Sequence, residues 1–412
     1  MIDINLLRKD PERIKKDIAK KKAPEKLIDS FLDVDERWRK KTAALDDLRA
    51  ERKSLGREAI ERAKEVKEQI KKFEEELRVL EEERSVILEQ IPNPPASDVP
   101  VGDDESGNKV LYEVGEKPKI KSPKDYLALT EGLIDTERAA KVSGGRFGYI
   151  LGDLVMLEFA LVKFALDSLR PHGFMPIVPP VMAKSRVMRG MGKGKFIDGG
   201  DAFHLPQDDL YLVGSSEHTI GPFHMDEIFD EADLPRRYVG FSTCFRREAG
   251  SYGKDVKGIL RVHQFDKIEM FSFSLPEKSE EEHAFLLARI EEMMKALKLP
   301  YRVLAICTGD MGFGDYKQYD VDTWLPGQGK YRETQSCSNV GDFQSRGINI
   351  KFRRAPGGKA EGYVHTLNST AFAIGRMIIA IVENNQQADG SIIVPEVLRA
   401  YVGKPEIKAK ED

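Results

Sequence analysis

Charged side chains occur in two neighbouring segments whose other residues resemble interior strands of a sheet. The segment YVGFSTCF (238–245) runs into RREAG, and ILRVHQFDKIEMFSF (259–273) follows a glycine-rich stretch. Side chains alternate between the two faces of a strand, so a hairpin of these segments can gather on one face Arg246, Glu248, Arg261, Phe265 and Glu269. Buried charges are costly unless they are paired or bound to a ligand. The pattern favours a ligand-binding face, and a solvated face with cross-strand ion pairs is the alternative.

The side chains on this face indicate what it could bind. Two arginines, two glutamates and one aromatic ring suit phosphates, an amine and a flat ring, which together describe ATP and an amino acid. The stretch GMGKGKF (190–196) fits neither G-x-x-x-x-G-K-[ST] nor G-x-G-x-x-G, and we expect a mobile basic loop there. A nucleotide must then be held by arginine side chains on a sheet.

Composition sets the limits within which such a site must be built. The chain has 412 residues, of which 41% are hydrophobic and 33% charged, and its formal net charge is −4. This is ordinary for a globular protein of two or three domains. We find neither an apolar run of the roughly 18–20 residues that a membrane helix needs nor a signal-peptide core. Three scattered cysteines predict neither a disulfide framework nor a zinc site, so we expect a cytoplasmic protein without membrane attachment.

Residues 1–100 predict an N-terminal domain with an antiparallel helical coiled-coil arm at about 31–91. Apolar residues recur there at spacings of three and four, Gly56 separates two helices, and IPNPP (91–95) ends the second. At 1.5 Å per residue the arm is roughly 40 Å long. Residues 49–72, around the turn, hold nine Lys or Arg against five Asp or Glu. They form either a solvated coiled coil with i,i+4 pairs or a basic tip that touches a polyanion.

Residues 101–412 predict a second domain of the α+β class. Helical stretches such as 151–173 and 279–299 alternate with short strands and Gly/Pro turns. Because several strands follow one another without a helix between them, we expect a mainly antiparallel sheet flanked by helices.

Four segments and the arm resemble one known family. FRREAGSYGKDVKGILRVHQFDKIE is similar to motif 2 of class II aminoacyl-tRNA synthetases, and specifically of seryl-tRNA synthetases. FALDSLRPHGFMPIVPP (164–180) resembles motif 1, HTLNSTAFAIGRMIIAIVEN (365–384) resembles motif 3, and GKYRETQSCSN (329–339) resembles the family's metal- and ATP-binding stretch. The hairpin followed by IPNPP is similar to the family's tRNA-binding arm. The resemblance implies a class II catalytic domain at 101–412 that activates serine with ATP and transfers it to tRNA.

The resemblance also implies a role for each charged residue. Arg246 would grip the α-phosphate and the serine carboxylate and stabilise charge in the transition state. Glu248 would accept from the adenine amino group, Phe265 and Arg376 would stack on the two adenine faces, and Arg261 would hold the triphosphate tail. Of these, the catalytic residues would be Arg246, Glu248, Arg261 and Arg376. The full ATP-binding set it implies is Arg246, Arg247, Glu248, Arg261, Val262, Phe265, Glu333, Thr334, Gln335, Ser336 and Arg376.

Two further sites follow from the same resemblance. Glu333 and Ser336 would ligate Mg²⁺, an ion that prefers oxygen and keeps several waters. The serine site it implies comprises Ser215, Ser216, Glu217, Arg246, Glu269, Asn368 and Thr370. The usual family pattern there is Thr-x-Glu, whereas this chain has Ser215-Ser216-Glu217, which bears on how threonine is rejected.

The resemblance also implies partners. Motif 1 would form a homodimer interface, and the arm residues Arg52, Lys53 and Arg57 would contact tRNA(Ser), with tRNA(Sec) as a second candidate acceptor. Two alternatives share part of these features. One is a synthetase-like amino acid:carrier-protein ligase, against which the long arm argues. The other is an inactive RNA-binding paralogue, against which the complete charged set argues.

Overall fold

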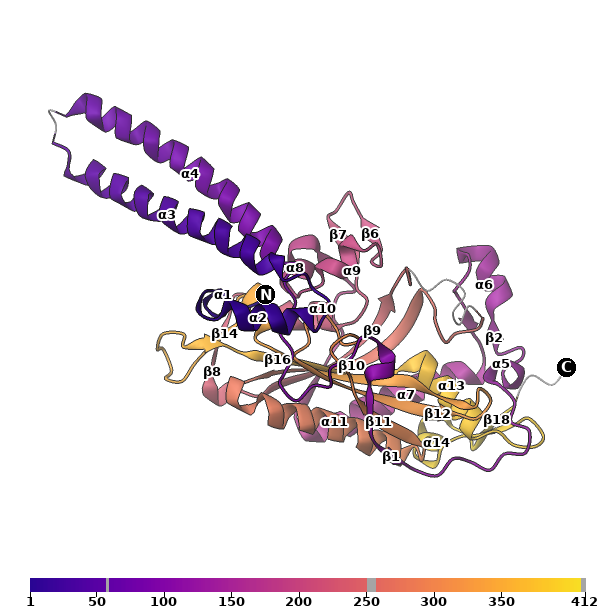
Figure 1. Cartoon of the computed structure of the whole chain (residues 1–412). Coiled ribbons are helices and arrows are strands. Elements are labelled where there is room, and N and C mark those ends of the chain that lie inside the picture. The colour runs from indigo at the N-terminus through magenta and orange to yellow at the C-terminus, as the bar shows by residue number, and fades with distance from the viewer. Residues whose placement is uncertain (57–58, 250–256, 409–412) are drawn as a thin grey trace. The chain divides into compact units, whose positions relative to one another are not determined.

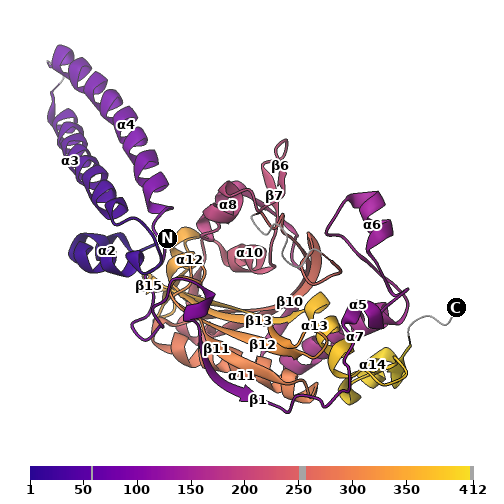
Figure 2. The ribbon, with the colours of Figure 1, turned by 45° about the vertical axis from the view of Figure 1, so that its right-hand side comes forward.

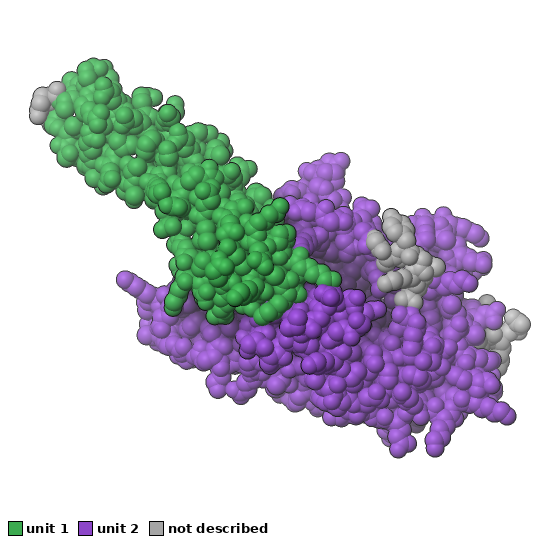
Figure 3. Space-filling view, viewed as in Figure 1, with its two compact units in different colours: residues 1–94 green, residues 95–412 purple. Residues whose placement is uncertain are grey.

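The computed structural model describes residues 1–56, 59–249 and 257–408, which fall into two compact units, Met1–Pro94 and Pro95–Asp412 (Figure 3). The division lies inside the proline-containing segment that ends the predicted arm. Each unit has an apolar core of its own. In the described part of the chain, every helix is too short or too polar to cross a membrane.

The first unit is helical. Short helices α1 (Ile4–Lys9) and α2 (Pro11–Ala19) precede two long antiparallel helices, α3 (Lys26–Ser54) and α4 (Ile60–Leu88) (Figure 1). Each long helix has 29 residues and is therefore about 44 Å long. The side chains buried between them are Leu45, Val66 and Ile70, flanked by Leu48, Leu55, Phe73 and Leu77. The predicted helical hairpin and its apolar seam are confirmed.

A buried carboxylate joins three helices of this unit. Asp35 of α3 is fully buried and accepts hydrogen bonds of 2.8 Å from Nε and Nη2 of Arg8 in α1. Arg84 of α4 lies 2.9 Å from the same carboxylate, and Arg39 donates to it at 3.1 Å. Burial by itself raises the pKa of Asp35, but the arginines outweigh it and hold that pKa below its ordinary value. Arg84 therefore occupies an apolar seam position because it is paired there and also lies 4.2 Å above the Trp38 ring.

The second unit is built on one large sheet, which has eight strands within the described residues. Its neighbouring strands are antiparallel except for the edge pair β4 and β9, which is parallel. In spatial order the strands are β1 (Lys109–Val114), β11 (Tyr301–Ala305), β12 (Lys317–Leu325), β13 (Lys330–Gly341), β16 (His365–Ala373), β10 (Gln264–Ser274), β9 (Arg236–Phe245) and β4 (Phe174–Ile177). The predicted α+β architecture is confirmed.

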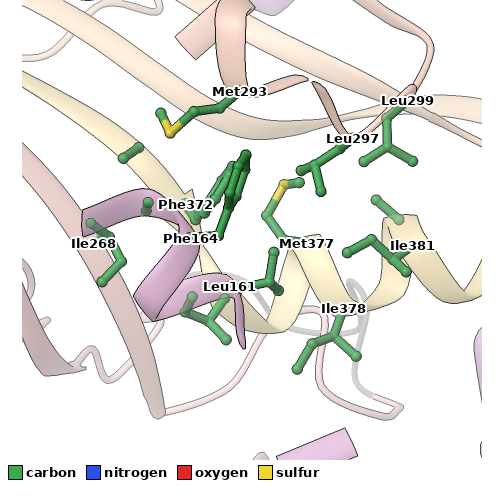
Figure 4. Close-up of a cluster of buried hydrophobic side chains, with 14 of the residues drawn as sticks. Leu161, Phe164, Ile268, Met293, Leu297, Leu299, Phe372, Met377, Ile378 and Ile381 are labelled. Carbon is green, nitrogen blue, oxygen red and sulfur yellow. The ribbon is translucent and has the colours of Figure 1, made fainter. Parts of the chain in front are cut away.

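Three helices cover one face of this sheet: α7 (Asp153–Leu169), α11 (Ser279–Ala296) and α13 (Ile374–Asn384). Figure 4 shows side chains of all three meeting those of β10 and β16. The rings of Phe164 and Phe372, for example, stack with their centroids 6.2 Å apart. Because side chains alternate along a strand, Ile268 and Met270 of β10 enter this core, and Lys267 and Glu269 face the other way.

Smaller elements surround the sheet. The short helices are α5 (Tyr126–Leu129), α6 (Thr136–Ser143), α8 (Ser185–Gly190), α9 (Gly194–Asp198), α10 (Glu217–Ile220), α12 (Phe343–Gly347) and α14 (Arg399–Val402). The small sheets are β2–β3 (Ile134–Asp135, Tyr149–Ile150), β5–β7–β6 (Met182–Lys184, Leu210–Leu212, His204–Leu205), β15–β14–β8 (Gly362–Tyr363, Lys351–Arg353, Ile228–Asp230) and β17–β18 (Ile392–Ile393, Glu406–Ile407). In Figure 2, α8 and α10 lie above the large sheet and α11 lies below it. The face opposite the apolar core is therefore partly covered by short elements, and it is the face that holds charged side chains.

Replacing Asp35 with alanine should loosen the helical unit, because three arginines then lose their buried partner. Breaking a buried pair in this way costs about 3–5 kcal/mol. Hydrogen exchange of α3 and α4 amides in the full-length protein measures the loss. Glu36→Ala is the matched control, since Glu36 is the adjacent acid and is exposed, and it should change exchange little.

The effect should also depend on pH in a defined direction. Because the folded-state pKa of Asp35 is lowered, its stabilisation is present above the unfolded-state pKa of about 3.9 and is lost as the pH falls through the folded-state value. The difference between wild type and Asp35→Ala should therefore shrink in acid. Equal exchange in the two proteins at neutral pH would contradict the assignment.

Candidate active site

A cavity opens on the face of the sheet away from the apolar core. Its walls come from the end of β9, residues 259–262, β10, β13, β16 and the start of α13. The predicted site residues that line it are Arg246, Glu248, Arg261, Val262, Phe265, Glu333, Thr334, Ser336, Thr370 and Arg376. The register explains the grouping, since Phe265 pairs with Cys244 and Lys267 pairs with Ser242, as the hairpin prediction required.

Arg246 is fixed by its backbone and its side chain. Its amide donates to the carbonyl of His263 at 3.0 Å, and its Nε donates to the carbonyl of Gly214 at 3.1 Å. The guanidinium lies 5.5 Å from the centroid of the Phe265 ring. His263 has a structural role here, because its Nδ1 lies within hydrogen-bond distance, 3.0 Å, of the carbonyl oxygen of Arg246. The cavity thus presents an arginine beside an aromatic ring, an arrangement suited to a phosphate attached to a flat base.

Arg376 and Glu333 form a second charged group of the cavity. Nη1 of Arg376 donates to the carbonyl oxygen of Glu333 at 2.8 Å and lies 3.1 Å from its carboxylate. Burial raises the pKa of Glu333, but Arg376 outweighs that effect and lowers it overall. Arg261 is likewise paired, with the carboxylate of Glu248. The two other arginines that line the cavity, Arg261 and Arg376, therefore each have a carboxylate partner.

Two carboxylates that the sequence reasoning missed lie next to Glu333. Asp322 is opposite Glu333 in the β12–β13 register, and Asp320 is opposite Ser336. Both line a neighbouring cavity of about 710 Å³ that shares Arg261, Glu333, Ser336 and Arg376 with the first. Burial and the nearby Glu333 raise the pKa of Asp320 well above its ordinary value, and burial raises that of Asp322. The alternation YDVDT was the signal available in the sequence.

The predicted serine-binding glutamates lie among lysines. Glu269 is buried, its Oε2 lies 2.8 Å from Nζ of Lys267 and accepts from Thr370 Oγ1 at 3.1 Å. Burial raises its pKa more than Lys267 lowers it. Glu217 is paired with Lys193; burial raises its pKa, but Lys193 and other nearby positive charge lower it to about 2. Sequence reasoning missed both lysines, although Lys267 has the same strand parity as Glu269.

The chain around Glu217 reaches the sheet because β9 has a glycine there. Gly240 is opposite Glu269 in the β9–β10 register, and a Cβ at Gly240 would lie 3.2 Å from Ser216 Oγ. The Ser215 hydroxyl accepts from the amide of Glu217 at 3.3 Å. Asn368, buried in β16 two residues before Thr370, has the same strand parity as Thr370. The predicted serine-site positions Ser215, Ser216, Glu217 and Asn368, which do not line the cavity, thus lie on segments that meet beside Glu269.

Two predicted ATP-site residues direct their side chains elsewhere. Nε of Arg247 donates to the carbonyl of Ala202 at 3.2 Å, and its guanidinium lies over Phe203. Nε2 of Gln335 contacts the sulfurs of Met294 and Met377 in the apolar core. Any part that these two residues play in binding would come from the backbone. Gln335 is buried opposite Val321, next to a bulge in the β12–β13 ladder, whereas Glu333, Thr334 and Ser336 line the cavity.

The predicted arm residues belong to the helical unit. Arg52 and Lys53 lie in the last turn of α3 and are exposed, whereas Arg57 lies outside the described residues. The stretch 190–196, expected as a loop, instead contains the end of α8 and the start of α9.

The sheet topology and the arginine-lined cavity together define a class II aminoacyl-tRNA synthetase. The family model described as tRNA synthetase class II core domain (G, H, P, S and T) matches residues 203–385, and that of the seryl-tRNA synthetase N-terminal domain matches residues 1–95. The chain belongs to the seryl-tRNA synthetase family, as the sequence resemblance predicted.

Relatives and solved structures agree over the whole chain. Serine–tRNA ligase of Thermobifida fusca is 44% identical over 98% of both chains, and that of Pyrococcus furiosus is 44% identical over 99% of this chain and 97% of the relative. Seryl-tRNA synthetase from Pyrococcus horikoshii complexed with ATP superposes with a TM-score of 0.94 at 40% identity, covering 100% of both chains. Cytoplasmic serine–tRNA ligase from Naegleria fowleri in complex with AMP gives 0.89 at 35% identity, covering 100% of this chain and 99% of that one.

The two adjacent arginines after β9 give a discriminating test of the cavity. Arg246→Ala should lower amino-acid-dependent ATP–pyrophosphate exchange by about 10²–10³-fold, the usual loss when a charge-stabilising contact is removed. Arg247→Ala should lose much less, because its guanidinium faces Ala202. Circular dichroism checks that both variants fold. Equal losses in the two variants would show that the cavity has been assigned wrongly.

Proposed function

We propose that this protein is a serine–tRNA ligase that forms seryl-adenylate from L-serine and ATP and then transfers serine to tRNA(Ser). The observation that carries the proposal is the position of the buried Glu269–Thr370 pair beside the arginine-lined cavity. A carboxylate and a hydroxyl suit the ammonium and hydroxyl groups of serine, and the arginines suit the phosphates of ATP. Membership of the family supports the same reaction.

The chemistry needs positioning and charge stabilisation rather than a protein nucleophile. An oxygen of the serine carboxylate attacks the α-phosphorus, the bond to the β-phosphate bridge breaks, and pyrophosphate leaves. Arg246 would contact the α-phosphate, where charge develops. Phe265 and Arg376 would hold the adenine between them, Glu248 would accept from its amino group, and Arg261 would bind the phosphate tail. Arg261 would then exchange its present carboxylate partner, Glu248, for phosphates.

The oxygen-rich end of the cavity fits Mg²⁺ brought in with ATP. Among the described residues, no group of three or more His, Cys, Asp or Glu is arranged to hold an ion by itself. Mg²⁺ bound to nucleotides commonly takes one or two carboxylates and keeps its waters. We propose that Glu333 and Ser336 are its protein ligands, and the ion would neutralise charge on the phosphates. Asp320 and Asp322 add carboxyl oxygens to the lining of the neighbouring cavity.

The amino-acid pocket would discriminate by unsatisfied polar groups and by space. Alanine lacks the hydroxyl, so it would leave Glu269 and Thr370 unpaired, which a hydrogen-bonding site rejects strongly. Threonine carries one more methyl group and must be excluded by the walls. Ser215 has one methyl group less than the threonine usual at this position, so it contributes less to that wall.

We also propose that the enzyme is a homodimer. The edge strand β4, the residue after it and helix α7 expose large apolar side chains, namely Met175, Val178, Met156 and Phe159. An apolar edge of this kind favours association with a second copy, and it coincides with the segment similar to motif 1. The basic end of the helical hairpin would bind the tRNA backbone. We expect the enzyme to act in the cytoplasm, with tRNA(Sec) as a candidate second acceptor.

Exchange and charging assays test the function directly. Purified protein should exchange pyrophosphate into ATP in the presence of serine, far less with alanine or threonine, and should charge tRNA(Ser) transcripts. Exchange without charging would favour the carrier-protein ligase, and neither activity in a folded protein would favour an inactive paralogue.

Replacing Glu269 with glutamine should weaken serine binding more than ATP binding. The amide keeps the shape but loses the negative charge that would face the substrate ammonium. In the wild type, serine affinity should fall as the pH decreases through the raised pKa of Glu269, because the protonated group no longer attracts a cation. The variant should lack that part of the dependence. Michaelis constants for serine and ATP measured from pH 5.5 to 8.5 decide the matter. If only the Michaelis constant for ATP rose in the variant, Glu269 would not belong to the serine pocket.

Deleting residues 36–88, with a short Gly/Ser bridge in their place, should spare serine-dependent exchange and cripple tRNA charging. Charge reversal at Arg52, Lys53 and Arg57 should act in the same way but more mildly. Each lost phosphate contact should reduce the slope of log affinity against log salt by up to about 0.7–0.9. Reversal at Lys16 and Lys20, which are exposed outside the long helices, is the control. Normal charging by the deletion protein would make the arm purely structural.

A further inference from the structure

A half-buried lysine, Lys193, is paired with the buried Glu217 carboxylate. Nζ of Lys193 is in ion-pair contact with Oε1 of Glu217, whose side chain is only 7% exposed. The other charged groups near this pair are Lys267 and Glu269 of β10, Arg246 after β9, and Asp315. His218 adjoins Glu217, and burial with Lys193 nearby lowers the pKa of His218 well below its ordinary value. His218 is therefore neutral at physiological pH, and Lys193 is the partner in direct contact with Glu217 on this side.

The backbone fixes where Lys193 lies. Its amide donates to the carbonyl of Met188 at 3.0 Å, and its carbonyl accepts from the amides of Phe196 and Ile197. The preceding Gly192 has φ +74°, and a Cβ there would lie 2.7 Å from the Phe343 ring. A side chain at this position would therefore be both strained and obstructed. The short segment between α8 and α9 is thus shaped to place one lysine.

The next helix secures the same segment against the site. The Phe196 ring meets the His218 ring edge-on, with centroids 5.5 Å apart. A Cβ at Gly214 would lie 2.8 Å from Phe196, and the carbonyl of Gly214 accepts from Arg246. Lys193 and the groups of the serine site are therefore parts of one packed assembly.

The pairing with Lys193 determines the ionisation of Glu217. A carboxylate as buried as Glu217 would take up a proton if it had no cationic partner. Lys193 is the largest of the influences that keep it ionised. Glu269 is in the opposite situation, since burial and the charge of Glu217 raise its pKa. The site thus contains two neighbouring carboxylates, of which Glu217 has a lowered pKa and Glu269 a raised pKa.

We propose that Lys193 is a positioning residue for the amino-acid site, which keeps Glu217 ionised and in place to receive the ammonium group of serine. The inference rests on the proposed function, because it requires serine to bind beside Glu217 and Glu269. It assigns a role to a residue that acts through Glu217 rather than through contact with the reacting atoms.

The test replaces Lys193 with methionine, which matches the unbranched lysine chain up to Cε and removes the charged Nζ. The Michaelis constant for serine in ATP–pyrophosphate exchange should rise at least about tenfold, equivalent to one unit of pKa, and the constant for ATP should change little. Lys193→Arg should restore most of the serine affinity. Lys195→Met is the matched control, since Lys195 lies two residues away and its Nζ lies 4.6 Å from the centroid of the Phe313 ring.

The pH profile separates this role from a merely structural one. In the wild type, the acid limb of kcat/KM for serine should report one group, Glu269, because the pKa of Glu217 lies near 2. In Lys193→Met, the pKa of Glu217 rises, so the limb should move to higher pH and steepen toward two protons. Lys193→Met with an unchanged serine constant and an unchanged limb would overturn the proposal. The proposal would also be overturned if Lys193→Met lost serine affinity and Lys193→Arg, with a wild-type melting temperature, failed to restore it.

The outcome is distinguishable from failure of the proposed function. If the wild-type protein shows no serine-dependent exchange, the function itself is wrong. If the wild type is active and Lys195→Met impairs serine binding as much as Lys193→Met does, the basic segment acts through its overall charge and the specific pairing is wrong.

Discussion

A lysine and a glutamate on the interior strand β10 are tolerable because they are paired with each other. Lys267 and Glu269 stand two residues apart on the same strand face and form an ion pair of 2.8 Å beneath the cavity. Arg376 with Glu333 and Arg261 with Glu248 repeat the arrangement. An unpaired charge in such a place would cost several kcal/mol. Ion pairs within the protein thus hold charged groups at the site, and phosphates and an ammonium can replace or join their partners.

The ion pairs depend in turn on the sheet having one apolar face and one charged face. Ile268, Met270 and Phe372 anchor β10 and β16 to α7, α11 and α13, so the side chains between them must face the cavity. A shift of the register by one residue would turn the charged set into the apolar core. The large apolar cluster therefore does more than stabilise the domain, because it fixes which side chains reach the ligand face.

The helical unit also contains a buried charge that is paired, and there the pairing sets how the helices align. Asp35 lies at the point where α1, α3 and α4 meet, and arginines from all three helices converge on it. Apolar side chains alone would allow neighbouring helices to slide by a turn, whereas a buried carboxylate with fixed partners admits one register. We infer that the ion cluster fixes how the helices align at the base of the long hairpin, and that the apolar heptad seam holds α3 and α4 together beyond that point.

Much of the fold and the core of the site were predictable from the sequence. Heptad spacing gave the hairpin, strand parity placed Phe265 and Glu269 on one face, and the motif segments identified the family. These succeed because period and residue type are local properties of a chain. Gln335, by contrast, was expected in the ATP-binding set, whereas its amide nitrogen contacts methionine sulfurs in the apolar core.

Other features were decided by tertiary structure alone. The ion pair of Lys193 with Glu217 joins residues 24 positions apart, one just before α9 and the other at the start of α10. The approach of Asp322 to Glu333 depends on a bulged register between β12 and β13. The direction of Arg247 toward Ala202 depends on how residues 201–203 pass the end of β9. Sequence by itself determined the period of each element, the residue types on each face and the family. Which charges meet, and therefore which carboxylate is ionised, was decided only by packing, because Coulombic energy depends on distance and burial, and neither is a property of local sequence.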